Sequence, residues 1–148
     1  MLWILIIGIV VFIDQLVKFF VVKNLAIGAS VTVINKFFYI YHIGNTGAAW
    51  SILDGQRVLF IIITSVACVA IAYILMRSKV KLLKLALSLI FAGAVGNLID
   101  RVLTGSVTDF LRFDFGSYTF PIFNVADMSV VIGSAVLMYY MFFIYKEN

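Results

Sequence analysis

The stretch from Val58 to Met76, VLFIIITSVACVAIAYILM, decides the fold class of this chain. Its 19 residues include no Asp, Glu, Lys or Arg, and they match the length of a helix that crosses the hydrocarbon core of a bilayer. A strongly basic segment, RSKVKLLK, follows at positions 77–84. Because loops rich in Lys and Arg stay in the cytoplasm, this segment is predicted to connect two transmembrane helices on the cytoplasmic side.

Three more apolar runs of similar length cover residues 2–22, 82–103 and 124–145. No Lys or Arg precedes the first run and no small-residue cleavage site follows it, so it is predicted to be a retained helix and not a cleaved signal peptide. With the basic connection inside, both termini are expected in the cytoplasm. Segments 23–57 and 104–123 are expected on the outer side.

The first outer segment is predicted to form a small β-hairpin or cradle at the membrane interface. Ser30–Asn35 and Phe37–His42 are rich in β-branched and aromatic residues, and Gly28 and Gly44 bound them. The predicted fold is therefore an all-α membrane protein, a four-transmembrane-helix bundle with this extracytoplasmic hairpin. Residues 1–148 are expected to form a single integral membrane domain.

The composition excludes an ordinary soluble domain. The chain of 148 residues is 64% hydrophobic and 12% charged, with a mean hydropathy of +1.15. The net charge of +4 reflects the basic loop, so no nucleic-acid partner is expected. Cys68, the single cysteine, lies inside an apolar run and is interpreted as a small buried hydrophobe.

The ionisable residues inside the predicted spans require an explanation, because placing each of them in the membrane costs on the order of 3 kcal/mol of insertion free energy. They are Asp14, Lys18, Asp100, Arg101 and Asp127. Helical period puts Asp14 and Lys18 on one face of the first span, Asn97 with Asp100 and Arg101 on one face of the third, and Asn124 with Asp127 on one face of the fourth. The assigned topology brings all three groups to the outer half of the membrane. This agreement in depth favours a functional site, although a polar cluster that only joins helices stays an alternative.

Asp109 follows the third span on the outer side, and Pro121 turns the chain back toward Asp127. Two aspartates in a partly dehydrated site cannot both ionise easily, so one keeps a proton while the other acts as a base. Such a pair can hydrolyse an amide by activating water and protonating the carbonyl oxygen. Serine, cysteine and metal-dependent proteases would need residues that the sequence does not supply. His42 is the only histidine and Glu147 the only glutamate, so neither a nucleophilic triad nor a metal site is predicted. No cofactor is expected.

Five ordered blocks resemble lipoprotein signal peptidase, the bacterial signal peptidase II. The blocks are Asp14–Lys18 (DQLVK), Asn45–Ser51 (NTGAAWS), Gly93–Arg101 (GAVGNLIDR), Val107–Phe110 (VTDF) and Phe120–Asp127 (FPIFNVAD). The resemblance implies a membrane aspartyl endopeptidase that cleaves diacylglyceryl-modified prolipoproteins just before the lipidated cysteine. It also implies a location in the bacterial cell membrane, with the active site near the extracytoplasmic face.

The resemblance implies roles for particular residues. Asp109 and Asp127 are the implied catalytic dyad, and the implied supporting residues are Asp14, Asn45, Asn97, Asp100, Arg101 and Asn124. Arg101 is expected to bind a backbone carbonyl, a carboxylate or a phospholipid headgroup, or to pair with Asp100. Asn124 is expected to orient Asp127 or bind the substrate backbone, or only to cap the fourth helix. Asn45 is expected to form, with Gly44 and Gly47, a turn that gates the substrate or an ordinary Gly-rich turn.

Other polar and aromatic residues are expected to be structural. Asp14 with Lys18 is expected to brace the first helix. Trp50, Tyr39 and Tyr41 are expected to anchor the chain at the interface, with a substrate clamp as the alternative, and Asp114 and Arg112 to be solvated loop charges. The chain is expected to act as a monomer.

Two rival functions stay open at this point, a proton-coupled transporter and a non-enzymatic membrane scaffold. A transporter needs an ionisable group that is reachable from both sides, but the cytoplasmic half of each predicted span is almost free of such groups. A scaffold is expected to tolerate loss of either aspartate.

Overall fold

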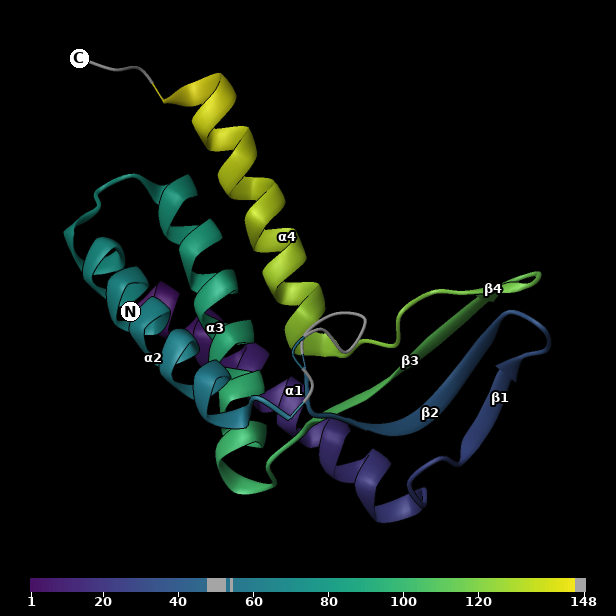
Figure 1. Ribbon diagram of the computed structural model, residues 1–148. Helices are drawn as coiled ribbons and strands as arrows, with labels where there is room; N and C mark the ends of the chain where they lie inside the picture. The colour runs from purple at the N-terminus through teal and green to yellow at the C-terminus, as the bar shows by residue number, and fades with distance from the viewer. Residues whose placement is uncertain (48–52, 54, 146–148) are drawn as a thin grey trace.

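Four long helices and one antiparallel sheet make up the fold of the computed structural model, which describes residues 1–47, 53 and 55–145 (Figure 1). The helices are α1 (Leu2–Asn24), α2 (Arg57–Arg77), α3 (Lys81–Leu103) and α4 (Val125–Tyr139), which continues through a π-helical turn at Tyr140–Ile144. Each is long and apolar enough to cross a membrane. The four predicted spans are thus confirmed, with ends that agree to within two residues. The chain is a multi-pass membrane protein.

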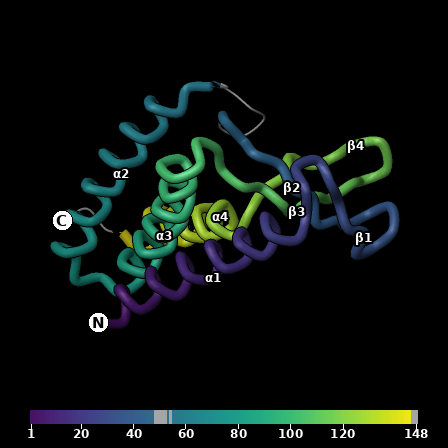
Figure 2. The backbone as a smooth tube through the Cα atoms, turned by 90° about the horizontal axis from the view of Figure 1, so that it is seen from below, coloured from purple at the N-terminus to yellow at the C-terminus, as the bar shows by residue number. Residues whose placement is uncertain are grey.

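Helix α3 lies at the centre of the bundle and packs against the other three helices (Figure 2). Small residues let it approach α4 closely. A Cβ atom on Gly93 would overlap the backbone carbonyl oxygen of Ala126 and lie 2.7 Å from Cγ2 of Val130. At Gly133 of α4, a Cβ atom would lie 2.8 Å from the carbonyl oxygen of Ala86. These contacts fix the height of α4 against α3.

The sheet extends from the end of the bundle where α1 and α3 end and α4 begins (Figure 1). Its strands are β1 (Ser30–Ile34), β2 (Phe38–Asn45), β3 (Val107–Phe115) and β4 (Tyr118–Thr119), in that order and all antiparallel. The predicted hairpin is present as β1 and β2. The prediction missed β3 and β4. Strand β3 pairs with a strand more than 60 residues earlier, and this long-range pairing leaves little local signal. Strand β4, paired with the end of β3, has only two residues.

The interpretation of Arg112 and Asp114 as solvated loop charges is wrong, because both lie on β3 and bind each other. Nε and Nη2 of Arg112 donate to the two carboxylate oxygens of Asp114, each at 3.0 Å. The hydrogen bonds from Arg112 hold the pKa of Asp114 below its usual range. The guanidinium lies over the rings of Tyr39 (5.4 Å) and Tyr41 (5.8 Å).

The anchoring and clamping roles foreseen for Tyr39 and Tyr41 stay predictions, although both rings are half-buried on β2. Trp50 lies outside the described residues. His42, the only histidine in the sequence, is buried, and its Nδ1 lies 2.8 Å from the carbonyl oxygen of Leu25 at the end of α1. This hydrogen bond ties β2 to the end of the first helix.

Candidate active site

Asp109 is held on β3 with only 2% of its surface exposed. Nδ2 of Asn45, from the neighbouring strand β2, donates to Oδ2 of Asp109 at 2.9 Å, and Nδ2 of Asn124 donates to Oδ1 at 2.6 Å. Burial raises the pKa of Asp109 to about 7, and the charge of Asp127 acts in the same direction against the opposing hydrogen bonds of the two Asn residues. At neutral pH this carboxyl therefore exists in both protonated and ionised forms.

Asp127 occupies the first turn of α4, where the local sequence Asn-Val-Ala-Asp forms a capping box. The backbone N–H of Asp127 donates to Oδ1 of Asn124 at 2.9 Å, and the backbone N–H of Asn124 donates to Oδ2 of Asp127 at 3.1 Å. Nδ2 of Asn97, from α3, donates to Oδ1 of Asp127 at 2.8 Å. The two donors thus hold both oxygens of this carboxylate in place at the start of α4.

A single amide connects the two aspartates. Asn124 is fully buried, and its Nδ2 binds Asp109 while its Oδ1 accepts the N–H of Asp127. The same Nδ2 also donates to Oδ1 of Asn97 at 3.1 Å. Two of the expected roles of Asn124, the helix cap and the orientation of Asp127, are therefore present in the geometry, and one side chain performs both. Binding of the substrate backbone by Asn124 stays a prediction.

A buried ionic cluster lies behind the two aspartates, at the meeting point of α1 and α3. Nζ of Lys18 lies 2.8 Å from Oδ2 of Asp14 and 2.9 Å from Oδ2 of Asp100. Gln15, which sequence reasoning missed, adds donors to Asp14 (3.2 Å) and Asp100 (3.0 Å). The adjacency of Gln15 to Asp14 in the DQLVK block was the only signal for it.

Arg101 does not pair with Asp100, the alternative foreseen from the sequence, because Asp100 binds Lys18. Nη2 of Arg101 donates instead to the carbonyl oxygen of Gly47 at 3.0 Å, and its guanidinium lies 4.9 Å from the ring centroid of Phe60. Within the described part of the chain, its Nε is buried without a hydrogen-bond partner.

Asn45 contributes a turn as well as a bond to Asp109, because its Oδ1 accepts the backbone N–H of Gly47 at 3.0 Å. This is the turn that the sequence predicted there. The rest of that sequence block, residues 48–51, lies outside the described residues.

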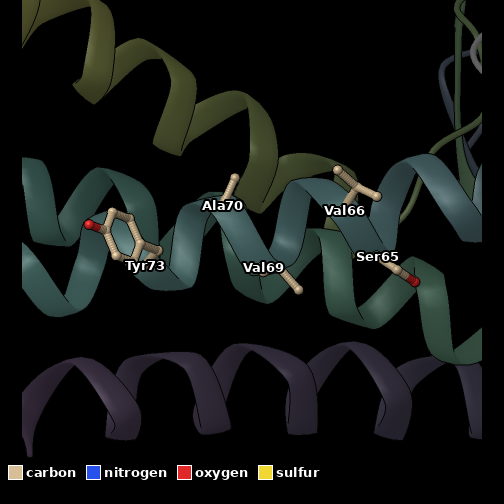
Figure 3. Close-up of a pocket in the computed structure, with 5 residues that line it drawn as sticks. All are labelled: Ser65, Val66, Val69, Ala70 and Tyr73. Atoms are coloured by element: carbon tan, nitrogen blue, oxygen red, sulfur yellow. The ribbon is translucent and has the colours of Figure 1, made fainter.

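An open apolar groove of about 540 Å³ lies elsewhere, on α2. Its lining residues all come from this one helix: Ser65, Val66, Val69, Ala70 and Tyr73 (Figure 3). None of them belongs to the polar cluster, so the groove is separate from the candidate site.

The family model described as Signal peptidase (SPase) II matches residues 6–143. The chain belongs to this family. The lipoprotein signal peptidase of Bacillus pumilus (strain SAFR-032) is 48% identical over 130 residues, which cover 86% of this chain and 84% of the relative. That of Bacillus subtilis (strain 168) is 41% identical over 143 residues, covering 95% and 93%.

A solved structure described as a bacterial membrane enzyme superposes with a TM-score of 0.87 at 39% identity, covering 99% of this chain and 93% of that chain. A second such structure has the same TM-score at 41% identity, with coverages of 97% and 94%. The resemblance drawn from the five sequence blocks is therefore confirmed. Membership of the signal peptidase II family makes the chain a membrane hydrolase, an endopeptidase of the aspartic type.

Proposed function

We propose that this chain removes signal peptides from bacterial prolipoproteins that carry diacylglycerol on the cysteine, by cleaving the peptide bond just before that cysteine. The observation that carries the proposal is the pair of buried aspartates joined by Asn124. The names of the relatives, lipoprotein signal peptidases, support the substrate class.

The two aspartates differ in environment, and this difference suggests their roles. Asp127, at the start of α4 and bonded by Asn97, acts as the base that takes a proton from water. The water oxygen then attacks the scissile carbonyl carbon. Asp109, with its pKa near 7, donates its proton to the carbonyl oxygen. When the tetrahedral intermediate collapses, Asp127 gives its proton to the leaving amine, and Asp109 takes a proton back from a hydroxyl group of the intermediate as the new carboxyl group forms.

The supporting residues hold these two groups or receive the substrate. Asn45, Asn97 and Asn124 donate hydrogen bonds to the carboxylates, and Asp14 and Asp100 anchor the backbone next to them. The guanidinium of Arg101, held by the carbonyl oxygen of Gly47, donates to a substrate carbonyl or to a phospholipid headgroup.

The proposed orientation places the sheet and the aspartates near the extracytoplasmic face of the bacterial cell membrane, with both termini in the cytoplasm. The support is the basic connection between α2 and α3, which lies at the other end of the helices from the sheet. A lipid-anchored cysteine keeps its preceding peptide bond close to this membrane face. We propose that the enzyme works as a monomer with one integral membrane domain.

The substrate class is tested with purified protein in detergent and two forms of one prolipoprotein, with and without diacylglycerol on the cysteine. We expect cleavage of the modified form and a rate at least about 100-fold lower for the unmodified form, because the acyl chains position the scissile bond. Mass spectrometry of the products locates the cut. Equal rates for the two forms contradict the proposed specificity, and failure to cleave either form contradicts the proposed function.

The pH dependence of the rate follows from the pKa of Asp109. Because the proton on Asp109 is needed for the carbonyl oxygen, kcat is expected to fall as the pH rises through about 7. Single-turnover cleavage measured from about pH 5 to about pH 9 checks this. A rate that rises steadily across this range contradicts the role of Asp109 as the acid.

A further inference from the structure

Lys18 lies behind the two aspartates, yet the mechanism above gives it no part. We infer that Lys18 is a positioning residue of the reaction, whose ammonium group fixes the side chain of Asn97 and through it the orientation of Asp127 and Asn124. The inference rests on the proposed function and deepens it. It goes beyond the expectation that Lys18 only braces α1.

Lys18 is almost completely buried, at 3% exposure, and all three protons of its ammonium group have acceptors. These acceptors are Oδ2 of Asp14 (2.8 Å), Oδ2 of Asp100 (2.9 Å) and Oδ1 of Asn97 (3.1 Å). A brace within α1 needs only Asp14, four residues earlier on the same helix. The two bonds to α3 therefore need another explanation.

The bond to Asn97 decides how that amide is oriented. Oδ1 of Asn97 accepts from Lys18 and from Nδ2 of Asn124, both at 3.1 Å. A flipped amide would turn its NH2 group toward the ammonium and leave both groups as donors without an acceptor. With Oδ1 held in this way, Nδ2 of Asn97 has to face Oδ1 of Asp127, where it lies at 2.8 Å.

The same oxygen of Asn97 also orients the second aspartate. Because Nδ2 of Asn124 gives one hydrogen to Asn97 at 3.1 Å, its other hydrogen is directed to Asp109 at 2.6 Å. One buried cation thus determines the direction of the amide donors on both reacting carboxyl groups. Such networks are cooperative, so losing one member disturbs the others.

The backbone contacts of the cluster support this reading. The residue just before each reacting aspartate donates its N–H to a carboxylate that Lys18 binds: Thr108 to Asp100 at 3.0 Å, and Ala126 to Asp14 at 2.8 Å. Lys18 thereby neutralises the two carboxylates, Asp100 and Asp14, to which the backbones of β3 and α4 are hydrogen-bonded. If these backbone hydrogen bonds were lost and a reacting aspartate moved by about 1 Å, the rate could fall about 100-fold.

The test is a double-mutant cycle on purified enzyme with the lipid-modified prolipoprotein, using Lys18→Met, Asn97→Ala and the double variant. We expect Lys18→Met to lower kcat at least about tenfold with KM within roughly threefold of wild type, because substrate contacts are unchanged. If Lys18 acts through Asn97, the loss in the double variant is smaller than the product of the two single losses. The matched control is Lys23→Met, on the same helix, where the residue is exposed and its ammonium lies 5.7 Å from the centroid of the Phe19 ring. It is expected to keep the wild-type kcat.

A merely structural role gives a different result, namely a lower Tm with an unchanged kcat for the folded enzyme. An unchanged kcat in Lys18→Met, or losses that multiply in the double variant, overturns the inference. Should Lys18→Met not accumulate, Lys18→Arg carries the test, because it keeps the charge but its planar guanidinium cannot direct three protons at acceptors around one point. A wild-type kcat in Lys18→Arg also overturns the inference. Wild type is measured alongside, so that its failure to cleave contradicts the proposed function and not this inference alone.

Discussion

The Asp109→Asn enzyme is expected to lose at least about 1,000-fold in kcat while its Tm at about pH 8 is no lower than that of wild type. Activity falls because Asn has no proton to give the carbonyl oxygen. Stability is kept because at this pH the wild type has to bury an ionised carboxylate, whereas the neutral amide of Asn avoids that cost. Burial raises the pKa of Asp109 to about 7, above the 3.8 of the unfolded chain, so ionisation costs stability as the pH rises through that interval. The Tm difference between variant and wild type should therefore grow from about pH 4 to about pH 7.

The measurements are single-turnover cleavage and thermal unfolding in detergent. The control is Asp114→Asn, which makes the same chemical change on the same strand at a carboxylate already paired with Arg112 at 3.0 Å. It should keep the wild-type kcat. An Asp109→Asn enzyme that cleaves within about tenfold of wild type would show that Asp109 is not the acid.

Replacing Gly93 by Ala is expected to lower kcat at least about 100-fold and to lower Tm by about 5 °C or more. The new methyl group would overlap the carbonyl oxygen of Ala126, the residue just before Asp127. That oxygen belongs to the backbone and has no rotamer to change, so α4 must move away from α3. The movement carries Asp127 away from Nδ2 of Asn97, which now lies 2.8 Å away.

Gly8→Ala is the matched control, because nothing lies within 4 Å of a Cβ atom built on Gly8 in α1. This change should leave kcat unchanged, and Tm should be equal or slightly higher because Ala favours a helix. The two variants are compared by cleavage rate and by thermal unfolding. If Gly93→Ala behaves like Gly8→Ala, the close packing of α3 and α4 does not position Asp127.

The transmembrane spans and the convergence of polar groups could be predicted from the sequence alone, because both depend on patterns among neighbouring residues. A run such as Val58–Met76 carries its own hydrophobic signal, and helical period alone places Asn97 and Asp100 on one face. The structure adds where their polar atoms go. Asn97 bonds Asp127 and Asp100 bonds Lys18, contacts between helices that spacing along the chain does not specify.

The features that could not be predicted from the sequence depend on contacts between residues far apart in the chain. Strand β3 pairs with β2 across more than 60 residues, so Asp109 could be placed near the membrane but not on a strand beside Asn45. The pairing of Arg112 with Asp114 depends on the same strand, since alternate residues share one face only in extended backbone. Likewise, nothing in the DQLVK block indicated that Lys18 would reach Asn97 on another helix.

The most direct test of the central claim is single-turnover cleavage of a diacylglyceryl-modified prolipoprotein by wild type and by Asp127→Asn, at equal amounts of folded enzyme. Asn at this position can still accept the N–H of Asn124 and close the cap of α4, so the variant should fold. The account predicts that wild type cuts just before the lipidated cysteine and that Asp127→Asn leaves the substrate intact. Cleavage at the same bond and a similar rate by Asp127→Asn would contradict the two-aspartate mechanism.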